Sequence, residues 1–126
     1  MVFRGHDGLD ELTTTGPSSV VSTGDDSMSS FDLDASELGF PRADPTDLAG
    51  GDVEHNVAIA KSVLSGDTGP RRDVVLLNAA AALVVAGRVE GLAGGVETAA
   101  RSIDSGAAQG VLDRWVEVSR GSAPDG

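Results

Sequence analysis

The apolar positions of this chain follow two different patterns, and the change comes at the glycine pair of residues 50–51. Before that point, short apolar stretches are separated by Gly, Asp and Pro, which is typical of strands joined by turns. Residues 18–22 and 28–33 suit two short strands, with residues 23–27 as the hairpin loop between them. Residues 34–51 hold two prolines and the glycine pair, so an irregular connection is expected there.

After residue 51, apolar side chains recur every three or four residues, which predicts about four helices. Asp52 can cap the first by accepting backbone N–H groups of its first turn, and Pro70 suits the start of the second, where its missing N–H costs nothing. Gly66 and Gly87 are placed to end these two helices. The four helices are expected within residues 52–66, 69–87, 92–103 and 107–118.

The stretch from Val74 to Ala86 is apolar on nearly every side and should therefore be buried all round. A helix of that kind needs neighbours on all sides, and the chain opens with Met1 to Phe3 in what reads as the end of a strand. We therefore interpret residues 1–120 as part of a larger α/β domain, with strands and loops over 1–50 and helices over 51–120. A frayed tail is expected over residues 121–126.

Composition narrows the class of protein. With 126 residues, of which 40% are hydrophobic, the chain falls in the range of a single globular domain. Its formal net charge of −11 and its single lysine argue against binding to nucleic acid or to anionic membranes, since both need basic patches. The lack of cysteine excludes disulfides and thiolate-bound zinc. No apolar run approaches the ~20 residues of a membrane span and the start lacks a secretory signal, so a soluble cytoplasmic protein is expected.

The residues with the clearest chemical potential are two adjacent acids, Asp10 and Glu11, which follow a glycine-containing turn at residues 6–8. Ligands of open α/β sheets collect beyond the carboxyl ends of strands, and magnesium is often held by one or two carboxylates together with substrate phosphates. The pair can therefore be a magnesium site for a phosphorylated substrate. Adjacent acids are also common as solvated surface charges, and the spacing leaves both interpretations open.

Other polar residues also have two interpretations. His6 can act as a general acid or base, or serve only as a polar turn residue, and His55 is expected on the surface of a helix. Asn78 lies inside the apolar helix, needs hydrogen-bond partners if it is buried, and is expected to fix packing against a neighbouring backbone. The pair Arg71-Arg72 can meet a phosphate or remain solvated near a helix start.

Residues 3–12, with the sequence Phe-Arg-Gly-His-Asp-Gly-Leu-Asp-Glu-Leu, resemble a strand and acidic motif of the anthranilate phosphoribosyltransferase family. Other segments agree with the carboxyl-terminal portion of that family in order and spacing, so the resemblance spans nearly the whole chain. These segments are residues 15–17, 31–34, 38–41, 50–52, 56–58, 63–66, 69–73, 77–83 and 103–108.

The resemblance implies the carboxyl-terminal part of a nucleoside-phosphorylase/phosphoribosyltransferase-type α/β domain, with short strands and a hairpin followed by about four helices. Members of the family are glycosyltransferases that move ribosyl 5-phosphate from phosphoribosyl pyrophosphate (PRPP) to anthranilate in tryptophan biosynthesis, with Mg²⁺ as cofactor. The family's acidic pair holds the magnesium that bridges to the pyrophosphate. By position, Asp10 and Glu11 would take that role here.

The chain also departs from the family pattern. The glycine-rich Gly-Thr-Gly-Gly-Asp phosphate loop, the Lys-His-Gly-Asn-Arg segment and the helical amino-terminal domain are absent, and that domain carries anthranilate contacts and usually the homodimer interface. Arg4 stands where many members have His. We therefore expect a fragment of the transferase that is inactive on its own. The alternative is a non-enzymatic remnant or interaction module that pairs with a partner through exposed strand edges.

Overall fold

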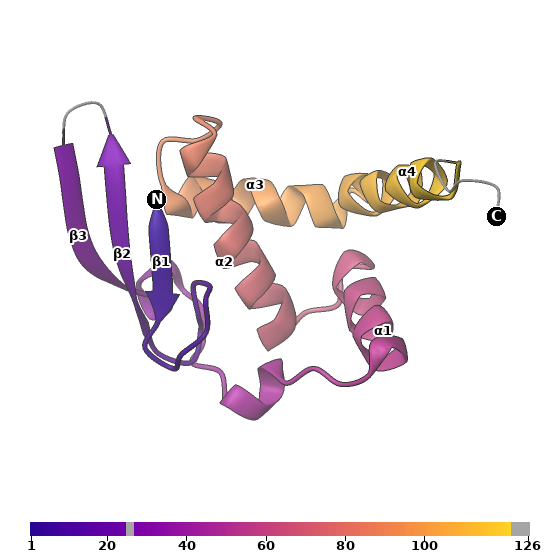
Figure 1. The fold of residues 1–126 in the computed structure, drawn as a ribbon, viewed down its shortest axis with the longest axis horizontal. Helices are drawn as coiled ribbons and strands as arrows, with labels where there is room; N and C mark the ends of the chain where they lie inside the picture. The colour runs from indigo at the N-terminus through magenta and orange to yellow at the C-terminus, as the bar shows by residue number, and fades with distance from the viewer. Residues whose placement is uncertain (25–26, 122–126) are drawn as a thin grey trace.

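The computed structural model describes residues 1–24 and 27–121, which form a three-stranded sheet followed by four α-helices. The sheet lies at one end of the molecule and the last helix, α4, at the other, with α2 and α3 between them (Figure 1). The α/β class expected from the sequence is confirmed. The strands and helices are β1 (Val2–Gly5), β2 (Pro17–Gly24), β3 (Ser27–Asp34), α1 (Val53–Leu64), α2 (Pro70–Val85), α3 (Leu92–Asp104) and α4 (Ala107–Gly121).

The sheet is antiparallel throughout, in the order β1-β2-β3. Gly5 at the end of β1 pairs with Ser18 near the start of β2, and Ser18 pairs in turn with Leu33 near the end of β3. Both strands of the expected hairpin are confirmed, whereas residues 25–26 of its loop lie outside the described residues. Ligands collect beyond the carboxyl ends of strands in mostly parallel sheets. This sheet is antiparallel, so that rule does not locate a ligand beside the acidic pair.

The connection between β3 and α1 is more regular than the sequence indicated. It contains two 3-10 helices, η1 (Ala35–Leu38) and η2 (Pro45–Leu48). Asp34 and Asp44 cap them, and each carboxylate accepts the backbone N–H two residues further on, at 3.0 and 2.9 Å. These caps give the first N–H groups of each short helix a partner, which explains order in a segment rich in proline and glycine.

Local signals set the helix ends as expected. The carboxylate of Asp52 accepts the N–H of His55 at 2.8 Å at the start of α1. Pro70 is the first residue of α2. Gly66 and Gly87, just beyond the ends of α1 and α2, have φ of 98° and 64°, values that glycine adopts without strain.

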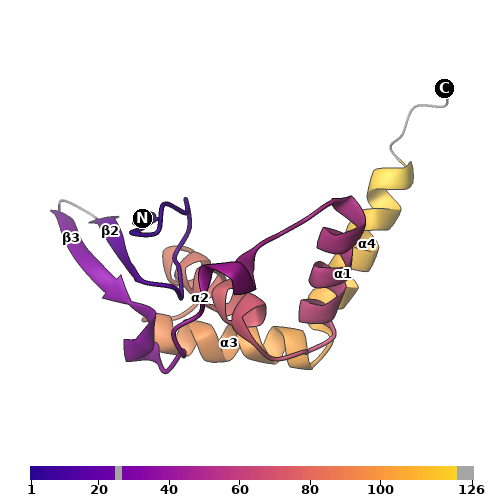
Figure 2. The same cartoon turned by 90° about the horizontal axis from the view of Figure 1, so that it is seen from below.

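The core lies on two sides of α2. One side packs against the sheet and the loop after β1. The other packs against α3 and the last turn of α1, and Figure 2 shows the sheet and α1 on opposite sides of α2. Burial of these aliphatic side chains is the main favourable term for the fold, at about 25 cal/mol per Å² of apolar surface. The buried apolar residues of the first side are Leu12, Val20, Leu33, Ala35, Leu77 and Ala81. Those of the second side are Val63, Leu76, Ala99 and Ile103.

The expectation that residues 74–86 are buried all round is wrong. Val75 and Val85 on α2 are 44% and 62% exposed, whereas Leu77 is fully buried. The sheet covers one side of α2 and α3 covers another, whereas Val75 lines the open cleft between α1 and α2 and is only partly covered. Apolar composition shows that side chains favour burial, but it does not show how many faces the rest of a chain can cover.

The fourth helix, α4, is present as expected and leaves several of its large apolar side chains exposed. Val111, Trp115 and Val118 are 55%, 71% and 66% exposed. Residues 122–126, on which most of the expected tail falls, lie outside the described part of the chain. None of the helices in that part is long and apolar enough to cross a membrane.

Candidate functional site

The acidic pair lies on a loop that starts where β1 ends. The N–H of Gly5 donates to the carbonyl of Leu9 at 2.9 Å, and the N–H of Gly8 donates to the carbonyl of Gly5 at 3.1 Å. Gly8 has φ of 99°, so the tight reversal uses a conformation that other residues avoid. The strand, the glycine turn and the position of the acids beyond them agree with the sequence expectation.

A carboxylate that the sequence did not single out organises this loop. One oxygen of Asp7 accepts the N–H of Leu9 at 3.0 Å. The other accepts the hydroxyl of Thr13 at 2.6 Å and the hydroxyl of Thr15. Burial alone would raise the pKa of the Asp7 carboxyl, but these hydrogen bonds outweigh burial and lower it below its ordinary value. Asp7 is therefore held as a charged acceptor at the centre of the loop.

The glycine before this turn is also required sterically. A Cβ added to Gly5 would collide with the Asp7 carboxylate and would lie 3.0 Å from the methyl group of Thr13. The run of threonines is supported in turn by the connection after β3, because the N–H of Ala43 donates to the carbonyl of Thr14 at 3.0 Å.

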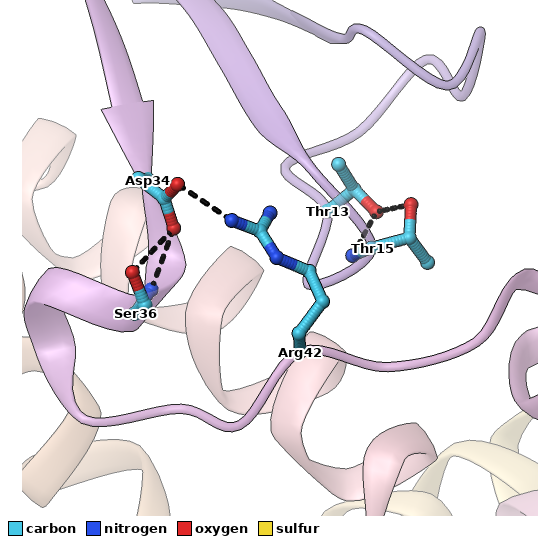
Figure 3. Close-up of polar contacts among 5 residues, drawn as sticks. All are labelled: Thr13, Thr15, Asp34, Ser36 and Arg42. Atoms are coloured by element: carbon cyan, nitrogen blue, oxygen red, sulfur yellow. Dashed lines mark hydrogen bonds and ion pairs between the residues drawn. The ribbon is translucent and has the colours of Figure 1, made fainter.

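The guanidinium of Arg42 lies between this connection and the end of β3. It donates to Asp34 at 2.7 Å, and Figure 3 shows it reaching from the connection towards the strand end beside the Thr13–Thr15 pair. The Ser36 hydroxyl and amide, together with Arg42, lower the pKa of Asp34 to about 2. The contact ties the connection to the end of β3.

The carboxyl-terminal end of the loop, just after Glu11, is held by Asn78 from the middle of α2. Its Oδ1 accepts the N–H of Leu12 at 3.0 Å, and its Nδ2 donates to the carbonyl of Leu12 at 2.8 Å and to that of Val74 at 2.9 Å. The expectation that Asn78 fixes packing against a neighbouring backbone is confirmed. Leu12 follows Glu11 directly and is fully buried, so its backbone is an anchor for the loop.

Between these two anchors, Asp10 and Glu11 are exposed. Within the described residues, neither carboxylate takes part in a hydrogen bond or an ion pair. Glu11 lines a cleft of about 730 Å³ between the loop, α1 and the start of α2, whereas Asp10 is not among its lining residues. Asp7, Thr15 and Arg71 line the same cleft.

Two adjacent carboxylates can supply the protein ligands of a magnesium site. Across residues 1–24 and 27–121, no group of three or more histidine or acidic residues is arranged to hold a metal ion. Magnesium prefers hard oxygen ligands, keeps several waters and commonly uses one or two carboxylates plus substrate phosphates. Because both carboxylates are exposed and have no partner in the described part of the chain, their oxygens are available for such a site. Asp10 and Glu11 fit this donor set, with the remaining ligands left to water and substrate.

The histidines lie away from this pair. The Nε2 of His6 is 2.9 Å from the hydroxyl of Ser19 and 3.5 Å from Asp32, on the β2–β3 ladder. Its contacts support the interpretation of a polar turn residue. His55 is exposed in the first turn of α1, as expected.

The two arginines have different environments. Arg71 donates to the carbonyl of Ala49 at 2.9 Å and faces the cleft. Arg72 is buried, donates to the carbonyl of Gly66 at 3.2 Å and pairs with Asp104 at 2.8 Å. The interpretation of Arg72 as solvated is therefore wrong, because the helical period places residue 72 on the same inner face as residue 76.

Comparison with known proteins identifies the family. The family model described as "Glycosyl transferase family, a/b domain" matches residues 1–109. The chain belongs to this family. The family-level expectation drawn from residues 3–12 and the later segments is confirmed.

Several relatives are anthranilate phosphoribosyltransferases. The one from Methylobacterium nodulans is 54% identical over 92% of this chain and 34% of its own length. The one from Thermobifida fusca is 52% identical over 98% of this chain and 37% of its own length. This chain thus spans about a third of the length of the relatives that it matches.

Solved structures of the same enzyme share the fold. The one from Thermus thermophilus has a TM-score of 0.84 at 36% identity and covers 94% of this chain and 35% of its own. The one from Saccharomyces cerevisiae, solved in complex with PRPP and Mg, has a TM-score of 0.81 at 27% identity and covers 91% and 33%.

Proposed function

We propose that this chain supplies the magnesium-binding portion of an anthranilate phosphoribosyltransferase, which transfers ribosyl 5-phosphate from PRPP to anthranilate. The observation that carries the proposal is the exposed pair, Asp10 and Glu11, on a rigidly held loop of a fold shared with solved anthranilate phosphoribosyltransferases. The yeast relative solved with PRPP and Mg supports a metal-assisted reaction.

In this proposal each carboxylate offers an oxygen ligand, and Glu11 does so at the wall of the cleft. A bound magnesium ion would offset the negative charge that builds on the departing pyrophosphate. The chain has a formal net charge of −11, so it repels a polyanionic substrate at long range. The acidic pair therefore suits a cation that stands between protein and phosphate better than it suits direct contact with phosphate.

The experiment joins residues 1–126 to the amino-terminal two thirds of the Thermobifida fusca relative and measures phosphoribosyl transfer against Mg²⁺ concentration. The double substitution Asp10→Ala with Glu11→Ala is expected to lower kcat/KM by about 100-fold or more, because both protein ligands are lost. The charge-matched control is Asp113→Ala with Glu117→Ala, two exposed acids on α4. Unchanged magnesium-dependent turnover in the Asp10/Glu11 variant would contradict the proposal.

A second candidate, an interaction module that pairs with another chain, has one observation in its favour. Among the described residues β1 pairs only with β2, so its other edge is open, and Val2 on it is 73% exposed. Sedimentation of the purified chain tests this candidate. A monomer that unfolds cooperatively at every concentration measured would rule it out.

A further inference from the structure

Within residues 1–24 and 27–121, the side chains of the two acids of the proposed metal site make no hydrogen bond or ion pair that sets their direction. Asp10 and Glu11 are exposed and unpaired among the described residues, so the backbone on either side must set where their oxygens point. That backbone is held before the acids by Asp7, and after them by Asn78 on Leu12 and by the Ser18 hydroxyl on the amide of Thr13. Of the two that come from other elements of the fold, only Asn78 holds the residue directly next to the pair.

The Asn78 contact has the chemistry of a clamp. A single amide side chain engages both the N–H and the C=O of Leu12, at 3.0 and 2.8 Å, across 66 residues of sequence. Its second Nδ2 hydrogen is used by the carbonyl of Val74 on its own helix, at 2.9 Å, which fixes the side chain before it meets the loop. An amide supplies this donor and acceptor pair, whereas a carboxylate cannot donate and an aliphatic side chain can do neither.

The clamp holds the residue next to the metal pair. Leu12 is fully buried between the sheet and α2, so its peptide groups cannot turn to water for replacement hydrogen bonds. Glu11 precedes it by one residue, and any rotation of the Leu12 backbone swings the Glu11 Cα–Cβ direction relative to the cleft.

We propose that Asn78 is a positioning residue for the metal pair: by clamping the backbone of Leu12, it sets the direction of the Glu11 carboxylate. The inference rests on the proposed function, since it assigns Asn78 a role towards the same site. Asn78 touches neither the cation nor the substrate in this role, and it acts through the peptide groups of Leu12.

The test uses this chain, labelled with ¹⁵N, and follows the broadening of its amide signals by Mn²⁺ as a paramagnetic substitute for Mg²⁺. The variants are Asn78→Leu, Asn78→Asp and Asp10→Ala with Glu11→Ala. Asp104→Asn serves as the stability control, because it disturbs an ion pair at the far end of α3 without touching the loop. Thermal unfolding of every variant is recorded alongside, together with the hydrogen exchange of the Leu12 amide.

In the unaltered chain, broadening is expected first at residues 9–12 as Mn²⁺ is added. Asn78→Leu should raise the Mn²⁺ concentration needed by about tenfold, the usual cost of losing a residue that orients a metal ligand. It should also speed exchange of the Leu12 amide. Asn78→Asp keeps the acceptor but turns a carboxylate oxygen towards the carbonyl oxygens of Leu12 and Val74, so it should also raise the Mn²⁺ requirement. The control variant Asp104→Asn should be less stable to heat but should need the same Mn²⁺ concentration for broadening as the unaltered chain.

The positioning role of Asn78 and the metal site at Asp10 and Glu11 can fail separately. If both Asn78 variants keep the original Mn²⁺ requirement while the Asp10/Glu11 variant loses the broadening, the positioning role is wrong and the metal site stands. If the unaltered chain shows no selective broadening at residues 9–12, or if the Asp10/Glu11 variant retains it, the metal site itself is wrong. If Asn78→Leu does not fold, Asn78→Asp decides: an unshifted Mn²⁺ requirement overturns the positioning role.

Discussion

The carboxylate of Asp104, the last residue of α3, lies 2.8 Å from the guanidinium of Arg72 in the first turn of α2. The Arg72 side chain is 9% exposed and the Asp104 side chain 58%. Arg72 also donates to the carbonyl of Gly66 at 3.2 Å. One buried cation therefore joins the end of α1, the start of α2 and the end of α3.

The asymmetry of this pair predicts the order of two effects. Asp104→Asn leaves the buried Arg72 guanidinium without its counter-ion and should lower the free energy of unfolding by about 1–2 kcal/mol. Arg72→Met keeps the apolar stem and leaves only an exposed carboxylate, so its cost should be smaller, below about 1 kcal/mol. Urea unfolding of both variants measures the order. A larger loss for Arg72→Met would show that the Gly66 contact, and not the charge, matters more.

Two neighbouring glycines on α3 should respond oppositely to alanine. A Cβ on Gly95 would lie 2.8 Å from the Cα of Ala80 and 2.9 Å from its carbonyl oxygen, and backbone atoms of α2 cannot move aside cheaply. Gly95→Ala is therefore expected to cost about 1–3 kcal/mol of stability. The matched control is Gly94→Ala, whose Cβ would approach nothing closer than 4.0 Å, from Val89. It should gain up to about 1 kcal/mol from helix propensity, and thermal unfolding distinguishes the two.

The stability of the fold should fall in acid, partly through Asp34. Hydrogen bonds from the hydroxyl and amide of Ser36, and then the contact with Arg42, lower the pKa of Asp34 to about 2 in the folded chain, from an ordinary value of 3.8. A depressed pKa in the folded state stabilises above the unfolded value and loses that effect as pH falls towards 2. Asp34→Asn should therefore show a shallower loss of stability between about pH 4 and pH 2. An NMR titration of Asp34 giving a pKa near 3.8 would contradict this.

The acidic pair should contribute little to folding. Asp10 and Glu11 are exposed and unpaired among the described residues, and the chain already has a net charge of −11. Asp10→Ala with Glu11→Ala is therefore expected to change the free energy of unfolding by less than about 0.5 kcal/mol, even though it should abolish metal binding. Thermal unfolding in the absence of divalent cations measures this. A loss of several kcal/mol would indicate that the pair has a structural role.

Features governed by neighbouring residues could be predicted from the sequence. The cap at Asp52, the helix start at Pro70 and the stops at Gly66 and Gly87 each depend on contacts within one turn, so the pattern of residue types is sufficient. Asn78 could also be interpreted in part, because a buried amide in an apolar helix must find partners, although its partner could not be named.

The Asp7–Thr13–Thr15 network was missed because nothing in the local pattern distinguishes it from a polar turn. Asp7 stands in a His-Asp-Gly turn, and the threonines stand six and eight residues further on. The available signals were the run of three threonines and the glycine at position 5, which leaves space for the carboxylate. Their meaning depends on a chain reversal that only the pairing of β1 with β2 produces.

The sequence by itself determined the strands and α-helices of this protein, their order and the family to which it belongs, because strand alternation, helical period and motif spacing are properties of neighbouring residues. Tertiary structure alone decided that β1 pairs with β2, that part of α2 stays exposed, that Arg72 is buried and that Leu12 is clamped by Asn78. Each of these is a choice among partners far apart in the chain. Such choices follow from which surfaces can be covered at once when the whole chain packs.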